Sequence, residues 1–385
     1  MKIQKILIIN TKYRIFGGED SNIVDEIKLL DKYFQVFYLE FDNSKRINIY
    51  DIFSFFSFSN FNSNKILKKT IDEFNPDFVY VHNLWFKANL GVLKILKKKP
   101  LVILHKIHNY RFQCSRYFLS KNHLKNQITC LACGIKISEL GIFNKYFKES
   151  YIKSFLLILH SKKYTKLITS YPLIIIAMSN FQVKKLIEYG IEDKKIKIYP
   201  NPIETLDNNL KYDSNSRYVL VVSRLVENKG ILEIISKWEE AKLSNLILKV
   251  IGSGELKEEL LKKYTLKNIE FVGELSNTET KKLMSKARAV IFASKLFEGQ
   301  PRVLLEAISF GIPTIYPKFA GMSEFFPKNY DLSFTQFDYD DLYEKIIKLE
   351  DTNFLINESL KLSDFVQKNL NESQYINKFK NILGE

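Results

Sequence analysis

Short apolar runs alternate repeatedly with segments of helical spacing in both halves of the sequence. Near-continuous runs of Val, Ile and Leu are typical of parallel strands, because helices cover both faces of such a sheet. The predicted strands of the first half span residues 6–10, 35–41, 77–81, 101–105, 173–178 and 196–199. Those of the second half span residues 218–222, 246–251, 269–272, 289–293 and 314–316. The pattern therefore predicts an α/β protein with two parallel sheets.

A polar segment separates the two series of strands. It opens with Pro200, Asn201 and Pro202 and extends to Asp213, and its composition is typical of a hinge or linker. A chain of 385 residues is also longer than one domain core usually supports. We expect a first domain over residues 1–200 and a second over residues 201–369. A final helix at about 370–385 has no place in the second sheet and is expected to pack back on the first domain.

The charge of the chain is concentrated in its first half. Residues 1–200 contain 33 Lys and Arg against 16 Asp and Glu, whereas residues 201–385 contain 25 against 27. A merely lysine-rich composition would raise both halves alike. The excess predicts an anionic partner, for which a phospholipid surface, a lipid diphosphate and nucleic acid are the candidate classes. No recognised nucleic-acid-binding module is present, so no nucleic-acid partner is expected.

Candidate residues for a basic and apolar face occur in three places in the first half. They are Lys65, Lys68 and Lys69, then Lys94 and Lys97 to Lys99, and finally the stretch 151–164. An ordinary solvated helix face is the alternative interpretation of each cluster. A basic and apolar face suits an anionic membrane and a polyprenyl-diphosphate-linked sugar.

No apolar stretch approaches the ~18–20 residues that span a bilayer. The apolar run at residues 6–9 is also shorter than the ~7–15 residues of a signal-peptide core. Three cysteines argue against a disulfide-stapled secreted protein. We therefore expect a cytoplasmic protein, with peripheral attachment to the inner face of the cell membrane as a further expectation.

The strongest chemical signal is the string at residues 297–307. Glu298 lies in a loop that contains Gly299 and Pro301, and Glu306 follows eight positions later in the helix that the loop opens. The free N–H groups of a helix amino terminus suit anionic or hydroxyl-rich ligands. Glu298 can accept hydrogen bonds from sugar hydroxyls, and Glu306 can accept them from a ribose. A strand–loop–helix turn with two incidental glutamates is the alternative interpretation.

This string closely resembles the E-x7-E signature of the retaining glycosyltransferase family numbered four. That family has the fold called GT-B, in which two Rossmann-like parallel-sheet domains face each other across a cleft. The resemblance implies an acceptor-side first domain, a second domain that binds a nucleotide sugar, and a metal-independent reaction that requires no cofactor. It implies a catalytic role for Glu298. The donor-binding residues that it implies here are Gly299, Gln300, Pro301, Val303 and Glu306.

Two further loops of the second half match the same family. Residues 221–225 with Lys229 resemble its G-R-L-x3-K-G loop, although Ser223 replaces the usual first glycine. The match implies that Arg224 and Lys229 hold the donor diphosphate, which a guanidinium and an ammonium can neutralise together. Residues 250–254 resemble the family's second glycine loop, which makes Gly252 a donor-binding residue.

The first half resembles a narrower group within that family. Gly17 and Gly18 belong to a G-G-E-D string like the group's glycine-rich loop, which lies near donor and acceptor, and a helical pattern follows from residue 22 to residue 32. Residues 81–83 and 104–111 resemble its V-H-N and L-H-N-Y-R stretches. The match implies that His108 reaches the transferred sugar, and the acceptor-side residues that it implies are His82, Asn109 and Arg111.

Some of these residues also have plainer interpretations. A lone histidine is more often structural than catalytic, but His108 directly follows a predicted strand, where open α/β sheets bind ligands. Arg111 either holds an acceptor phosphate or covers the rim of the site.

Three cysteines match three of four that the narrower group contains. Cys114, Cys130 and Cys133 suggest a structural zinc knuckle, which His123 could complete as the fourth ligand. The fourth family cysteine is replaced near Tyr146, so a site that has lost its metal is the alternative.

Asp338 and Asp340 form a D-x-D string, which holds a catalytic cation in the other glycosyltransferase fold. Here the string precedes a helical run at residues 342–349, and we expect it to cap that helix.

The resemblance to this family implies transfer of a sugar from a UDP- or GDP-sugar to a glycan or lipid-linked acceptor, in capsule, O-antigen or exopolysaccharide synthesis. A nucleotide-sugar epimerase of the same fold is the main alternative. A dinucleotide-dependent oxidoreductase is disfavoured because no G-x-G-x-x-G string follows the first strand.

Overall fold

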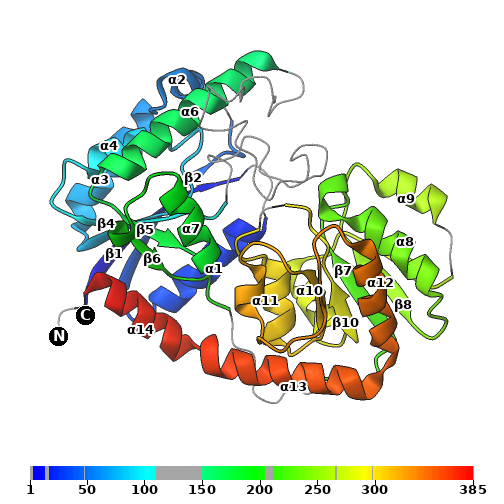
Figure 1. Cartoon of the computed structure of the whole chain (residues 1–385). Helices are drawn as coiled ribbons and strands as arrows, with labels where there is room; N and C mark the ends of the chain where they lie inside the picture. The colour runs from blue at the N-terminus through cyan, green and yellow to red at the C-terminus, as the bar shows by residue number, and fades with distance from the viewer. Residues whose placement is uncertain are drawn as a thin grey trace. The chain divides into compact units, whose positions relative to one another are not determined.

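The computed structural model describes residues 3–13, 17–46, 48–109, 150–203, 212–264, 267–296 and 298–384. The chain divides into two compact units. Unit 1 comprises Met1–Pro202 together with Ile376–Glu385, and unit 2 comprises Ile203–Tyr375. Each unit contains one six-stranded sheet, and all the paired strands are parallel (Figure 1). The prediction of an α/β protein with two parallel sheets is confirmed.

The sheet of unit 1 has the strand order β2-β1-β3-β4-β5-β6. Its strands are β1 (Lys5–Lys12), β2 (Gln35–Asp42), β3 (Phe78–Val81), β4 (Val102–Lys106), β5 (Ile174–Ala177) and β6 (Ile196–Ile198). The helices are α1 (Gly18–Leu30), α2 (Ile49–Ser57), α3 (Phe61–Phe74), α4 (Gly91–Leu96), α6 (Tyr151–Ser170), α7 (Asn180–Glu188) and, from the end of the chain, α14 (Glu372–Leu383). Helix α1 begins at Gly18, four residues before the predicted helical pattern, so the glycine-rich string forms its first turn.

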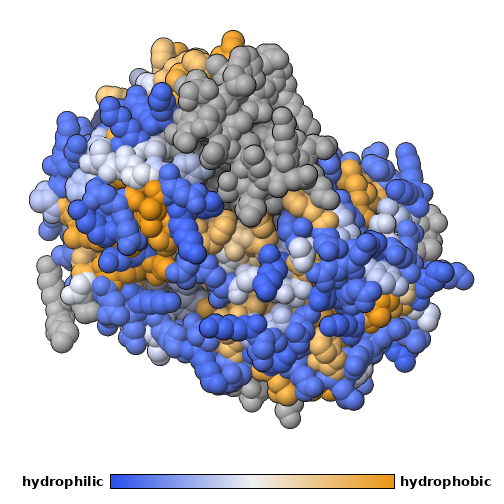
Figure 2. Space-filling model, in the orientation of Figure 1, coloured by the Kyte–Doolittle hydropathy of each residue, from blue (hydrophilic) through white to orange (hydrophobic). Residues whose placement is uncertain are grey.

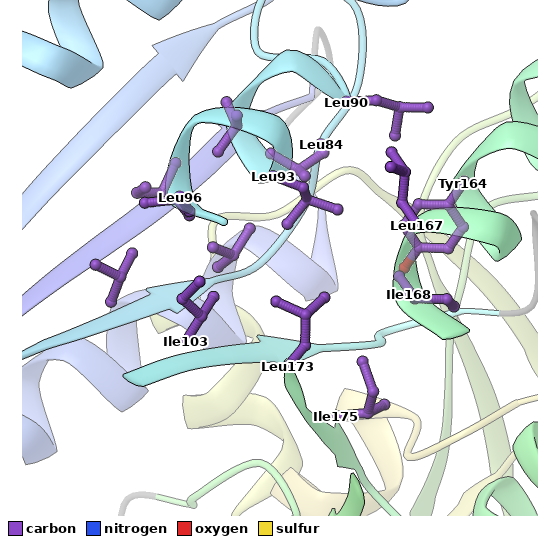
Figure 3. Packing of buried hydrophobic residues seen from close by; sticks show 14 of the residues in the cluster. Leu84, Leu90, Leu93, Leu96, Ile103, Tyr164, Leu167, Ile168, Leu173 and Ile175 are labelled. Carbon is purple, nitrogen blue, oxygen red and sulfur yellow. The ribbon is translucent and has the colours of Figure 1, made fainter. Parts of the chain in front are cut away.

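The apolar side chains of β1 divide between the two faces of this sheet. Leu7 and Ile9 pack in a buried cluster with side chains of α3, α4 and α6. Figure 3 shows part of that cluster, where α4 and α6 contribute side chains that meet those of β4 and β5. Tyr80, in register with Ile8, lies on the other face, where its hydroxyl donates to Glu26 of α1.

The last helix buries the aromatic side chain of Phe379 against unit 1. Phe379 of α14 is 1% exposed, and its ring centroid lies 5.6 Å from that of Phe34 and 5.7 Å from that of Tyr80. The ring of Tyr199 completes the contact at 5.3 Å. Ile376 of the same helix is also buried, at 4% exposed, and burial of such side chains stabilises the packing of the helix.

The sheet of unit 2 has the strand order β12-β11-β10-β7-β8-β9. Its strands are β7 (Tyr218–Val222), β8 (Ile247–Ile251), β9 (Ile269–Gly273), β10 (Ala289–Ile291), β11 (Thr314–Pro317) and β12 (Ser333–Phe334). The helices are α8 (Ile231–Ala241), α9 (Lys257–Lys263), α10 (Asn277–Met284), α11 (Arg302–Ser309), α12 (Tyr339–Ile347) and α13 (Thr352–Asn369). No residue range was predicted from the sequence for the short strand β12 or for the helices α2, α3, α4, α6, α7 and α13.

Candidate functional site

The glutamate and the lysine singled out in separate motifs of unit 2 are in direct contact. Lys229 Nζ lies 2.7 Å from Glu298 Oε1, and Ser294 Oγ donates to the same oxygen at 2.8 Å. Both side chains of the ion pair are less than one-fifth exposed, at 17% and 18%. Partial burial reduces solvent screening, so this pair orders the loop more strongly than an exposed pair would.

The loops that follow three neighbouring strands are tied together at one edge of the sheet. Ser223, after β7, donates its N–H to Ile251 O, and Gly252, after β8, donates to Gly273 O at the end of β9. Gly252 has φ +134°, and a Cβ there would lie 1.9 Å from Ser223 O. Only glycine fits this close approach. Parallel strands present their carboxyl ends at one edge, where α/β folds bind ligands, and Arg224 lies in the first of these loops.

Lys229 is positioned by a second glycine. It ends a short 3₁₀ turn, Glu227–Lys229, and Gly230 follows with φ +70° before α8 begins. A Cβ on Gly230 would lie 2.1 Å from Ala293 O, which belongs to the segment after β10. The N–H of Lys295 donates to Asn228 O from the same segment. These contacts bring the loop after β7 against the loop that carries Glu298.

The second glutamate lies one turn into α11. Glu306 Oε1 accepts a hydrogen bond from Arg302 Nε at 2.7 Å, and Pro301 is the residue before the helix. Gln300 is 5% exposed, Gly299 is buried and Val303 is half-buried, so the donor-binding residues implied by the family resemblance line the start of this helix. The free N–H groups of the first turn lie at the same place.

Sequence reasoning missed two residues of this region. Ser294 holds Glu298 through its hydroxyl, and Glu233 Oε1 accepts from Lys295 Nζ at 2.6 Å. The position of Ser294, four residues before Glu298 in the same loop, is the signal by which the sequence could have identified it. Nothing in the sequence marks Glu233, which lies in α8.

In unit 1, His82 follows β3 and His108 follows β4. His82 Nδ1 lies 2.8 Å from His108 Nε2, and the stacked rings are 1% and 8% exposed. Burial, followed by the charges of Lys106 and His105, lowers the pKa of His108 well below its usual value. Burial, followed by His108 and Lys106, does the same to the pKa of His82. Both imidazoles are therefore neutral at pH 7, and one proton lies between them.

The outer nitrogens of this histidine pair, His82 Nε2 and His108 Nδ1, are buried and have no hydrogen-bond partner among the described residues. His105 differs. Its Nδ1 lies 3.0 Å from Val81 O and its Nε2 lies 2.7 Å from the hydroxyl of Tyr164, so both of its nitrogens have protein partners. The pair therefore has hydrogen-bonding capacity left for a ligand, whereas His105 is structural.

A buried ion pair lies beside the two histidines. Lys106 Nζ is 2.9 Å from Glu26 Oε2, and neither side chain is exposed. Such a pair is costly to desolvate but still more costly to break. The Lys106 charge is the one that helps to keep His82 and His108 neutral.

The first turn of α1 is joined to the loops after β3 and β4. Asn109 Nδ2 donates to Glu19 Oε1 at 3.0 Å, and Asn83 Nδ2 donates to Glu19 Oε2 at 3.3 Å. The Asp20 carboxylate accepts from the N–H of Gly17 at 3.0 Å, and burial raises its pKa. Gly17, Gly18 and Asn109 are thus near one another, at the carboxyl edge of the unit 1 sheet.

Several predicted residues fall outside the described part of the chain. They are Arg111, Cys114, His123, Cys130 and Cys133, and their predicted roles stay predictions. Within the described ranges, no group of three or more His, Cys, Asp and Glu side chains could hold a metal ion. The capping prediction is confirmed, because Asp338 accepts from Asp341 N as the cap of α12, and Asp340 pairs with Lys237.

Comparison with known sequences identifies relatives among glycosyltransferases. Residues 202–368 match the family model described as "Glycosyl transferases group 1". An uncharacterized glycosyltransferase of Methanocaldococcus jannaschii is 28% identical over 265 residues, which cover 65% of this chain and 59% of that protein. The amylovoran biosynthesis glycosyltransferase AmsD of Erwinia amylovora is 32% identical over 99 residues, 25% of this chain and 28% of that protein. The matches thus span less than two thirds of either relative.

Solved structures share the fold of the whole chain. The structure of HepE from Anabaena in complex with UDP and glucose has a TM-score of 0.69 at 15% identity and covers 99% of both chains. Another structure of the same protein, with UDP-glucose, has a TM-score of 0.67. Residues 202–368 therefore match the family model of the glycosyl transferases group 1, and the whole chain has the two-domain GT-B fold.

Proposed function

We propose that the protein is a retaining glycosyltransferase that moves a sugar from a UDP- or GDP-sugar to a hydroxyl of a glycan or lipid-linked acceptor. In this proposal unit 2 binds the donor and unit 1 binds the acceptor. The reaction requires neither a metal ion nor a cofactor.

The observation that carries the proposal is the contact of Lys229 with Glu298 at 2.7 Å. An ammonium, aided by the guanidinium of Arg224, neutralises charge on a leaving diphosphate. A carboxylate accepts hydrogen bonds from sugar hydroxyls. A phosphate-binding cation directly beside a hydroxyl-binding carboxylate suits a ligand in which a sugar is joined to a diphosphate.

The proposed reaction requires no nucleophile from the enzyme. The acceptor oxygen forms a bond to the anomeric carbon as the bond from that carbon to the nucleoside diphosphate breaks on the same face of the sugar. An oxygen of the leaving β-phosphate takes the proton of the acceptor hydroxyl, and configuration is retained. Arg224 and Lys229 stabilise the charge that develops on the diphosphate. His108 is assigned a contact with the transferred sugar.

Uridine is the nucleoside that the relatives favour, since structures of HepE contain UDP and UDP-glucose. AmsD is named for amylovoran biosynthesis, which supports a role in making a cell-surface polysaccharide. The basic first half supports a lipid-linked acceptor on the cytoplasmic face of an anionic membrane. No helix in the part of the chain that the structure describes combines the length and apolar character needed to cross a bilayer.

The test is release of nucleotide from a panel of UDP- and GDP-sugars, with and without a lipid-linked acceptor. Glu298→Gln and Lys229→Met should each reduce acceptor-dependent release by about a hundredfold or more. Lys237→Met and Glu240→Gln are matched controls, because these residues form an ion pair of similar length on α8 and should leave the rate unchanged. Conversion of a donor into its isomer without acceptor would identify an epimerase instead. The anomeric configuration of the product, measured by NMR, tests retention.

A further inference from the structure

Helix α2 of unit 1 exposes its apolar side and buries its polar side. Ile49, Ile52, Phe53 and Phe56 have the spacing of one helix face, and they are 63%, 54%, 63% and 58% exposed. We call these four residues the apolar stripe. Figure 2 shows hydrophobic side chains gathered at the top of the molecule, where Figure 1 places α2. An exposed apolar face of this kind is typical of an interaction surface.

Polar contacts hold α2 in this orientation. Asp51 is 2% exposed, and its carboxylate accepts from Asn60 Nδ2 at 2.8 Å and lies 3.8 Å from Lys87 Nζ. Ser54 is fully buried and donates to Phe86 O at 2.8 Å. A rotation of α2 about its axis that buried the stripe would break the hydrogen bonds of Asp51 and Ser54. Each buried polar group left without its hydrogen bond costs about 1–3 kcal/mol. The outward orientation of the stripe is therefore built into the fold.

A basic pocket of about 310 Å³ adjoins the carboxyl end of α2. Its lining includes Lys68 of α3 and Lys94, Lys98 and Lys99 on and after α4. Lys99 pairs with Asp72 at 2.9 Å, whereas no ion pair involves the other three lysines among the described residues. Ser59, just past α2, also lines the pocket, so stripe and pocket are contiguous along the chain.

The pocket is already crowded with positive charge. Burial, followed by the charge of Lys163, lowers the pKa of Lys94. Bound anions would relieve that repulsion. Because a second copy of the chain would present the same basic pocket against this one, a symmetric dimer through this face would bring like charges together. A bilayer offers what the surface lacks, namely apolar acyl chains beside anionic headgroups.

We propose that the apolar stripe of α2 inserts into the interfacial region of an anionic bilayer, while Lys68, Lys94 and Lys98 bind the phosphates of its lipid headgroups. This deepens the proposed function, because it names the element that brings the acceptor side of the enzyme to a lipid-linked substrate. Apolar insertion combined with lysine–headgroup attraction is how interfacial helices gain affinity.

The test is flotation of the full-length protein with vesicles of phosphatidylcholine alone or mixed with phosphatidylglycerol. Wild type should bind the mixed vesicles, and high salt should weaken the binding. Phe53→Ser combined with Phe56→Ser should reduce binding about tenfold or more. Leu261→Ser combined with Leu360→Ser is the control, since these exposed leucines of unit 2 should not matter. Equal loss in both double variants would overturn the assignment to α2.

Lysine variants test the pocket. Lys68→Glu combined with Lys98→Glu should weaken binding to mixed vesicles by roughly fivefold or more per lysine. Lys262→Glu combined with Lys286→Glu makes the same change of net charge on exposed lysines of unit 2 and should have little effect. Comparable loss in the two variants would mean that net charge alone governs binding, which contradicts a headgroup site.

Insertion itself can be observed. The emission of a Phe53→Trp variant should shift to the blue and be quenched by brominated acyl chains, whereas that of Leu360→Trp should not. Sedimentation velocity tests whether a second copy of the chain, instead of a bilayer, covers the apolar stripe. If wild type bound no vesicles and formed a dimer that Phe53→Ser combined with Phe56→Ser dissociated, the proposal would be overturned.

Nucleotide release in vesicle-free solution should be unchanged in the stripe variants. If wild type releases nucleotide but binds no vesicles, only the membrane proposal fails. If wild type binds vesicles but releases nucleotide from none of the donors, only the proposed transferase activity fails.

Discussion

His82 Nδ1 and His108 Nε2 share one hydrogen bond of 2.8 Å, so the tautomers of the two histidines are coupled. When His82 Nδ1 donates, His108 carries its proton on Nδ1 and can donate to a ligand. When His108 Nε2 donates, its Nδ1 can only accept. The tautomer of His82, after β3, thereby decides whether His108, after β4, can donate a hydrogen bond to a ligand or only accept one.

Loss of this partner should impair turnover more than donor binding. His82→Phe is expected to lower kcat by about 10–100-fold with little change in the KM for the donor, as for other hydrogen-bond partners that orient a histidine. His82→Asn, whose amide can occupy the place of Nδ1, should recover part of the loss. Steady-state nucleotide release measures both. The ¹⁵N chemical shifts of His108 should change in the Phe variant, because its tautomer is no longer coupled to that of His82, and unchanged shifts there would contradict a positioning role for His82.

Acid should destabilise the protein through its buried histidines. Burial lowers the pKa values of His82 and His108, and it lowers the pKa of His105 to about 4. Below the unfolded value of about 6.5, the unfolded chain binds more protons than the folded one, so stability is fully present above that pH and is lost as the pH falls below it. Each such histidine lowers the free energy of unfolding by at most about 1.4 kcal/mol for each pH unit below that value. The thermal midpoint should therefore drop between about pH 7 and pH 5. If the thermal midpoint of His82→Asn fell by the same amount over this pH range, His82 would not contribute to the loss of stability.

The loop after β8 should tolerate no side chain at Gly252. A Cβ there would lie 1.9 Å from Ser223 O, so Gly252→Ala must displace the backbone that carries Arg224. We expect a loss of stability of about 2–4 kcal/mol and weaker UDP binding. Gly273→Ala is the matched control, because Gly273 also has a positive φ but no atom within 4 Å of its Cβ, and it should cost only about 1 kcal/mol. Thermal unfolding and UDP titration calorimetry compare the two.

The packing of the terminal helix should depend strongly on the aromatic side chain of Phe379. Phe379 contacts the rings of Phe34, Tyr80 and Tyr199 and is almost fully buried. Phe379→Ala is expected to cost about 3–5 kcal/mol and to speed amide exchange in α14. Leu360→Ala, at a position that is 64% exposed, should be close to neutral. Slow exchange in α14 of the Phe379→Ala protein would show that other contacts hold this helix.

The two parallel sheets were predictable because their strands are buried on both faces. A fully buried strand has to be apolar throughout, and that requirement is local, as Ile6 to Ile9 of β1 illustrate with no exposure at all. The start of α1 was predicted four residues late. Gly17 and Gly18 indicated a loop, but the Asp20 carboxylate accepts the Gly17 N–H and so stabilises an earlier helix start.

The alternation of buried strands with helices, and the loops in which Arg224, Lys229, Glu298 and His108 lie, could be read from the sequence alone. The contacts of these four residues, in contrast, follow from the packing of segments that are distant in the sequence. Lys229 and Glu298 are 69 residues apart, and they meet because Gly230 packs against the segment that precedes Glu298. The apolar spacing of α2 alone would indicate a buried face. Partners distant in sequence, at Phe86 and Lys87, bury its polar side instead, because a polar group must be satisfied wherever the fold places it.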